Sequence, residues 1–201
     1  DVAAELAGIA AQELPPDQAL VLLRELAPLL PSAPNAYLVL GFRAPEALAD
    51  AYRELLASDV QPRVRADLVT GVGMTTTPLG LEIARLALEN DPSPEVRLQA
   101  VFALTARRDP GLGEAALQQA LDDPRIAGDP VRLSAVVLAL QNLETTGDVN
   151  ALQRVGQRLQ TMAMSDASRQ TLAGILARGL PTTVAGGAGS GVADQPRQAS
   201  R

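Results

Sequence analysis

The stretch that decides the fold is Asp91-Pro92-Ser93-Pro94-Glu95-Val96-Arg97-Leu98-Gln99-Ala100-Val101. Its second half recurs as Val64-Arg65-Ala66-Asp67-Leu68-Val69 earlier in the chain and as Val131-Arg132-Leu133-Ser134-Ala135-Val136 later. The copies follow one another at intervals of roughly 32 residues, a repeat length that corresponds to one helical hairpin. The sequence therefore predicts an all-α chain of stacked helical hairpins, an α-solenoid.

The turn before each copy is rich in Asp and Pro. The interval from Asp59 to Asp91 equals that from Asp91 to Asp123 and that from Arg65 to Arg97. The third turn, residues 123–129, is three residues longer than the others, and we expect a loop to absorb the extra residues. This turn also contains Asp129. Either Asp123 or Asp129 therefore takes the place that Asp91 has in the second turn.

The composition supports helices. Apolar residues make up 47% of the 201 residues and aromatic residues only 2%, so the core must be built from Ala, Leu and Val. Strands favour β-branched and aromatic residues, whereas Ala and Leu are among the strongest helix formers.

The domain organisation follows from the repeats. We expect one helical repeat domain over residues 1–180, with clear repeats over 45–143 and atypical capping helices on either side. Residues 181–201 are rich in Gly and contain almost nothing large and apolar. Such a segment buries too little surface to offset its ordering entropy, so we predict a flexible tail or linker.

The Val-Arg helices behind Asp/Pro turns resemble HEAT repeats, particularly the short bacterial variety that is also found in phycobilin-lyase-related proteins. The resemblance is closest at residues 91–101 and covers about 45–143. It implies a hydrogen-bonded ladder in which the turn Asp of one repeat meets the helix Arg of another. The residues that it assigns to this ladder are Asp59, Asp91, Asp123 or Asp129, Arg65, Arg97 and Arg132.

Physical reasoning gives the ladder residues a structural role as well. A carboxylate at a helix N-terminus accepts from free backbone N–H groups and is favoured by the helix dipole, and an Arg offers several donors that can bridge it to the next repeat. The alternative is an arginine stripe that binds phosphate or carboxylate ligands. The acidic balance of the chain favours the structural role.

Residue types exclude most catalytic machinery. The chain has no His, Cys or Lys, which removes Ser/His and Cys/His triads, thiol nucleophiles, Schiff bases and the P-loop lysine. Asp122, Asp123 and Asp129 offer oxygen ligands, but residues 125–127 between them are Arg, Ile and Ala, so a helix-capping turn is the better interpretation than a cation site. We therefore expect no catalytic residue, no metal and no cofactor.

The charge limits the partners. The net charge is −6 and the sequence pI about 4.7, whereas nucleic-acid binding requires clustered positive charge. No apolar run approaches the roughly 20 residues that span a bilayer, so we expect no direct membrane insertion. All 17 basic residues are Arg, which is typical of high-GC bacteria. A chain that lacks Cys and starts without Met also fits the cell envelope or secretion.

Aligning the repeats gives a candidate contact strip on the Val-Arg helices. One equivalent position holds Asp67, Gln99 and Ser134, and another, one helical turn further on, holds Thr70, Phe102 and Val137. Phe102 and Val137 are equally compatible with an ordinary core. The strip predicts a non-catalytic module or scaffold that binds a protein partner on an extended face. Two alternatives stay open: a lyase-like or accessory enzyme acting on a small ligand, and a structural subunit of a cell-envelope or appendage assembly.

Overall fold

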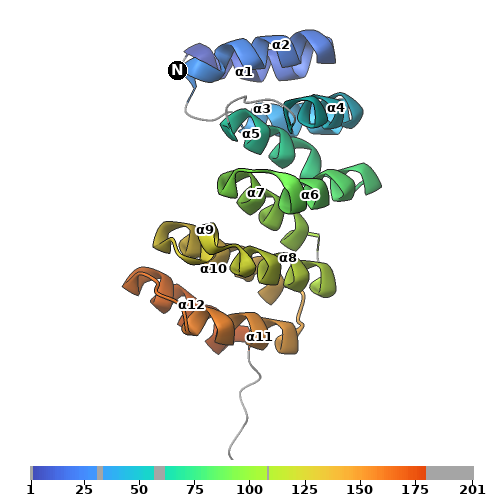
Figure 1. Ribbon diagram of the computed structural model, residues 1–201. Coiled ribbons are helices and arrows are strands. Elements are labelled where there is room, and N and C mark those ends of the chain that lie inside the picture. The colour runs from blue at the N-terminus through green and yellow to red at the C-terminus, as the bar shows by residue number, and fades with distance from the viewer. Residues whose placement is uncertain (1, 31–33, 57–61, 108, 180–201) are drawn as a thin grey trace, which may run out of the picture.

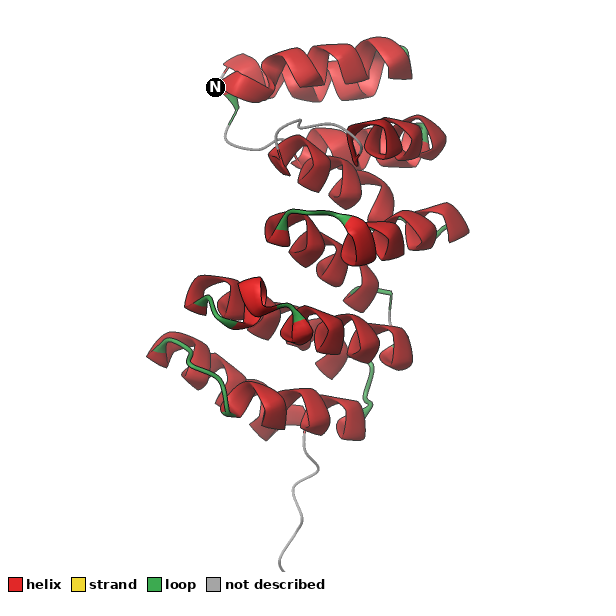
Figure 2. Cartoon of the chain, viewed as in Figure 1, coloured by secondary structure: helices red, strands yellow, loops and turns green. Residues whose placement is uncertain are grey.

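The computed structural model describes residues 2–30, 34–56, 62–107 and 109–179, and in these ranges the regular structure is entirely helical, with no strand (Figure 2). The prediction of an all-α chain is thus confirmed. Asp59 and the predicted tail, residues 181–201, lie outside the described residues. The elements are α1 (Val2–Glu13), α2 (Pro16–Leu26), a 3-10 turn (Ala27–Leu29), α3 (Pro34–Arg43), α4 (Pro45–Leu56), α5 (Pro62–Gly73), α6 (Pro78–Asn90), α7 (Pro94–Thr105), α8 (Pro110–Asp122), α9 (Pro124–Ala127), α10 (Pro130–Glu144), α11 (Val149–Gln160) and α12 (Asp166–Gly179).

The helices stack in layers, from α1 and α2 at one end of the molecule to α11 and α12 at the other (Figure 1). The three Val-Arg helices α5, α7 and α10 lie in one row with α1, α3 and α12, and each helix of this row packs on the next. We call it the Val-Arg row. Helices α2, α4, α6, α8 and α11 form the opposite row.

Proline and short polar residues set the helix starts. Every helix from α3 to α10 begins with Pro, whose fixed φ suits the first helical position and whose missing N–H is not needed there. The side chains of Thr77, Asp109 and Asp129 cap α6, α8 and α10 by accepting from backbone N–H groups. Helices α6 and α8 begin at Pro78 and Pro110 and end just before the turn aspartates Asp91 and Asp123.

The third turn is more ordered than the loop that the sequence suggested. Residues 124–127 form the single-turn helix α9, whose Ile126 is fully buried. Asp123 caps α9 by accepting from Arg125 N, and Asp129 caps α10. The extra residues therefore add a packed turn because they carry both an apolar side chain and two capping carboxylates.

Glycines let neighbouring helices of the Val-Arg row approach closely. A Cβ at Gly41 of α3 would collide with the backbone of Gly71 in α5, and a Cβ at Gly73 of α5 would lie 3.1 Å from Cβ of Ala103 in α7. Gly71 follows Gly41 at the same interval as Ala103 follows Gly73. Helix α3 therefore packs on α5 in the same register as α5 packs on α7, so the regular stacking begins before residue 45.

The core consists of Ala, Leu and Val with few aromatic residues, as the composition predicts. Tyr37 and Tyr52 are buried, whereas Phe102 is half-buried. No helix within the described ranges combines the length and apolar character needed to cross a membrane.

Candidate functional site

The first candidate site is the ladder, and its most buried member is Asp91, which follows α6. Arg65 of α5 donates to both carboxylate oxygens, from Nε to Oδ2 at 2.9 Å and from Nη2 to Oδ1 at 3.0 Å. The hydroxyl of Tyr52 in α4 donates to Oδ2 at 3.0 Å, and Ser93 N donates to Oδ1 at 2.9 Å. Asp91 is 0% exposed and Arg65 3%. This arrangement satisfies a buried ion pair with hydrogen bonds from three directions.

Burial and hydrogen bonding also shift the pKa values of the groups around Asp91. Desolvation, followed by the negative charge of Asp91, raises the pKa of the Tyr52 phenol well above its ordinary value. The hydrogen bonds to Asp91 raise the pKa of Arg65 despite the cost of burial. Tyr52 is therefore a neutral hydrogen-bond donor and Arg65 a permanent cation at neutral pH. Because both are sealed from solvent, an anionic ligand cannot reach this part of the ladder.

The second rung is centred on Asp123. Arg97 of α7 donates from Nη1 to Oδ2 at 3.2 Å, and its Nε donates to the backbone oxygen of Asp91 at 2.7 Å. Arg125 of α9 donates from Nε to Oδ1 at 3.0 Å and from Nη2 to Oδ2 at 2.8 Å. Hydrogen bonds from Arg125 lower the pKa of Asp123. Arg97 thus lies between two rungs.

The structure places Asp123, rather than Asp129, beside the helix Arg of the preceding repeat. Asp129 accepts from the backbone N–H groups of Val131 and Arg132 and caps its own helix. Asp123 corresponds to Asp91, because each accepts from the Arg of the preceding Val-Arg helix and from the backbone N–H group two residues further along the chain.

Arg132 departs from the expected ladder. Its Nη2 donates to Oε1 of Glu95 at 2.6 Å, back toward the preceding repeat, and its Nη1 donates to the carbonyl of Arg125 at 2.9 Å. A forward rung would need an acid before α12, but Ser165 stands there and its Oγ accepts from Ser168 N. The ladder therefore ends at α10 for want of a turn Asp.

The second candidate site is a groove on the Val-Arg row, with a volume of about 540 Å³. Three of the predicted contact residues, Asp67, Thr70 and Gln99, line it. Thr70 Oγ1 donates to Gln99 Oε1 at 3.3 Å. This hydrogen bond joins α5 to α7 in the lining of the groove. The other lining residues are Pro34, Pro62, Arg63, Ala66 and Glu95. The groove combines small apolar walls with one exposed carboxylate and one half-buried guanidinium.

The other three contact residues lie further along the row. Ser134 and Val137 of α10 line a smaller groove of about 200 Å³, together with Leu138 and residues of α12. Val137 is 1% exposed, so it belongs to the core and offers a partner little surface. Phe102 is half-buried against the core. The structure thus divides the predicted strip between two grooves, and Phe102 of α7 belongs to the lining of neither.

Sequence reasoning missed Arg63, Glu95 and Leu138. Glu95 follows Arg63 at the same interval as Gln99 follows Asp67, and each lies one helical turn earlier, so the same alignment could have identified them. Leu138 gave no such signal, because the equivalent residue of α7 is the buried Ala103. It is 50% exposed.

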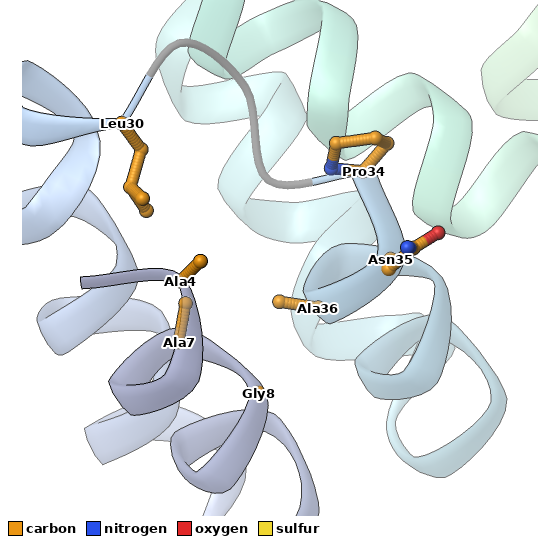
Figure 3. Close-up of a pocket in the computed structure, with 7 residues that line it drawn as sticks. All are labelled: Ala4, Ala7, Gly8, Leu30, Pro34, Asn35 and Ala36. Atoms are coloured by element: carbon orange, nitrogen blue, oxygen red, sulfur yellow. The ribbon is translucent and has the colours of Figure 1, made fainter. Parts of the chain in front are cut away.

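A third cavity of about 160 Å³ lies between α1 and α3 (Figure 3). Its walls are the small side chains of Ala4, Ala7 and Ala36, with Gly8, Leu30, Pro34 and Asn35. No residue of its lining is titratable, so it has no group for acid-base chemistry.

Among the described residues, no group of three or more acidic side chains is placed to hold a metal ion. Comparisons with protein-family models, curated proteins and solved structures found no match to this chain.

Proposed function

We propose that the chain is an α-solenoid of HEAT-like repeats that acts as a non-catalytic interaction module or scaffold. Three observations support this proposal: the layered helices, the regular interval between the Val-Arg motifs, and a rung that recurs from Arg65–Asp91 to Arg97–Asp123. Each layer contacts mainly its neighbours, which is the property that gives repeat proteins long continuous faces.

The observation that carries the function is the groove between α5 and α7. It is wide enough to accept side chains, and its lining of Pro34, Ala66 and Thr70 leaves no large side chain in the way. Arg63, which donates to the carbonyl of Ala27, and Glu95, which accepts from Arg132, place charges of opposite sign at the groove. A protein segment with apolar side chains and flanking charges fits this lining better than a nucleic acid, whose phosphates need clustered positive charge.

Charge placed along the two grooves tests this function. We expect the double substitution Gln99→Arg with Leu138→Arg to weaken capture of the protein partner at least about tenfold, because one buried unpaired charge in an interface costs at least about 1.4 kcal/mol. The measurement is quantitative affinity capture from an extract of the source organism, followed by titration of the captured partner. Melting temperature should change little because neither side chain is buried.

The matched control is Gln119→Arg with Gln157→Arg, which adds the same charge at exposed positions of α8 and α11 in the opposite row. If both double variants weakened capture of the partner equally, the effect would be one of general charge, and the grooves would not be the binding site. Turnover of a substrate that survives repurification and disappears on mutation of a carboxylate would contradict the non-catalytic function.

A further inference from the structure

The two ends of the stack differ in what they expose. At the first end, α1 presents Val2, Leu6 and Ile9, which are 73%, 44% and 45% exposed. Their spacing of four and then three positions places them on one face of the helix. Leu29, just beyond α2, is 69% exposed. The first layer therefore carries an apolar face that no described residue covers, and we call Val2, Leu6 and Ile9 the α1 face.

The other end is polar. Helices α11 and α12 expose no large apolar side chain among their described residues. Their exposed positions hold mainly amides, small residues and charges, among them Asn150, Gln157, Gln160, Gln170 and Ala173. A polar outer face is what the terminal layer of a repeat array needs to remain soluble. Helices α11 and α12 present such a polar face, whereas α1 presents an apolar one.

The charges of the first layer indicate what would pack on it. Glu5, Glu13, Asp17 and Glu25 are all exposed on α1 and α2. Between layers, acids are matched with arginines, as in Arg24–Glu54, Arg53–Glu82, Arg132–Glu95, Arg154–Glu114, Arg158–Asp122 and Arg178–Glu144.

Glu25 has a defined place in this pattern. It precedes Glu54 by the same interval as Arg24 precedes Arg53. Glu54 faces Arg24 of the layer before it, at 3.9 Å, and Glu82 faces Arg53 at 2.7 Å. The position of Glu25 thus corresponds to that of an acid that meets an arginine from a preceding layer. The occupant that complements this end carries arginine beside an apolar helix face.

We propose that the α1 face is a docking surface for an arginine-bearing helical hairpin of a partner polypeptide, which packs on α1 and α2 as one further layer. A second copy of this chain fits less well. Joining two first layers would bring their acids together, and the described part of the α11–α12 end lacks the apolar surface to cover Leu6 and Ile9. This proposal depends on the layer packing and not on the grooves.

A hairpin taken from the protein itself provides a defined probe. Repeating residues 62–93 ahead of Asp1 presents a second α5 and α6, with Arg63, Arg65 and Arg85, to the α1 face. We expect amide hydrogen exchange in α1 to slow at least about tenfold relative to the unextended chain, because a terminal helix becomes an internal one. In the extended chain with Leu6→Glu and Ile9→Glu, this protection should be lost.

Amide hydrogen exchange in α7, at the centre of the stack, is the control for folding. It should be the same in the extended and unextended chains, with and without the two substitutions, if the substitutions leave the fold intact. Absence of protection, or equal protection in the Leu6→Glu, Ile9→Glu chain, would overturn the proposal. Concentration-dependent dimers of the unextended chain that vanish with these substitutions in sedimentation velocity would overturn it in favour of a second copy. Cosedimentation of the unextended chain with phosphatidylglycerol vesicles, lost in the same variant, would overturn it in favour of a membrane surface.

Discussion

Asp91 and Asp123 occupy equivalent turns, yet their carboxylates are held in different ways. The carboxylate of Asp91 accepts hydrogen bonds from one arginine, one phenol and one backbone N–H group, all within the core. Asp123 is matched by two arginines, and the side chain of Arg125 is 45% exposed. The comparison shows that one sequence signal can give a sealed rung or an open one, depending on what the next residues supply. Removing a partner should therefore cost more at Asp91 than at Asp123.

The largest effect is expected for Arg65→Ala. It leaves the carboxylate of Asp91 buried with no cation, and breaking a buried pair typically costs about 3 to 5 kcal/mol. Chemical denaturation with urea measures this change in the free energy of unfolding. Arg53→Ala, which removes the surface pair with Glu82, is the control and should cost less than about 1 kcal/mol. Similar losses for the two variants would show that the buried pair of Arg65 and Asp91 contributes no more to stability than a surface pair.

Arg97→Ala should have a smaller effect, of about 1 to 3 kcal/mol, because Arg125 continues to neutralise Asp123. The same urea experiment applies. Combining it with Arg125→Ala should cost more than the sum of the single losses, since only the double variant leaves Asp123 without a cation. Strict additivity would mean that the two arginines do not share the carboxylate.

Tyr52→Phe removes one neutral donor from Asp91 while keeping the ring, so we expect a loss of about 1 to 2 kcal/mol. Tyr37→Phe is a matched control, because the buried Tyr37 hydroxyl has no hydrogen-bond partner in the described part of the chain and its removal should be neutral or stabilising. Thermal and urea denaturation of both variants compare them directly. A loss at Tyr37 as large as that at Tyr52 would contradict the role assigned to the phenol.

The sequence predicted the helices and the separation of the ladder partners better than it predicted their surroundings. The repeat interval indicates which turn each Arg faces, but nothing in it distinguishes Asp123 from Asp129, since both cap helices. Tyr52 comes from the opposite row and belongs to no repeated motif, so its contact with Asp91 required the three-dimensional packing. The contact strip could not be divided into two grooves beforehand, because alignment places Val137 on a face without showing that α12 and the core cover it.

The smallest effect concerns pH and separates the open rung from its surroundings. Because Arg125 lowers the pKa of Asp123, the folded state favours the ionised carboxylate. The resulting stability is fully present above the pKa of Asp123 in the unfolded chain, about 3.9, and is lost as pH falls through the lower pKa of the folded state. The stability difference between the wild type and Arg125→Ala should therefore be largest near pH 6 and shrink below about pH 4. We expect less than about 1 kcal/mol at neutral pH, because solvent screens the exposed Arg125.

The control for this pH dependence is an Asp123→Asn background, where no carboxylate titrates at the rung. There, Arg125→Ala should produce a stability difference that does not vary with pH over the same range. Urea denaturation of the four chains between about pH 2.5 and 7 measures both effects. An Arg125→Ala effect that grows toward acid, or that keeps its pH dependence in the Asp123→Asn background, would show that Arg125 acts through a group other than Asp123. An Arg125→Ala effect that does not vary with pH in either background would instead assign the contribution of Arg125 to its bond to the carbonyl of Pro92, which carries no titrating group.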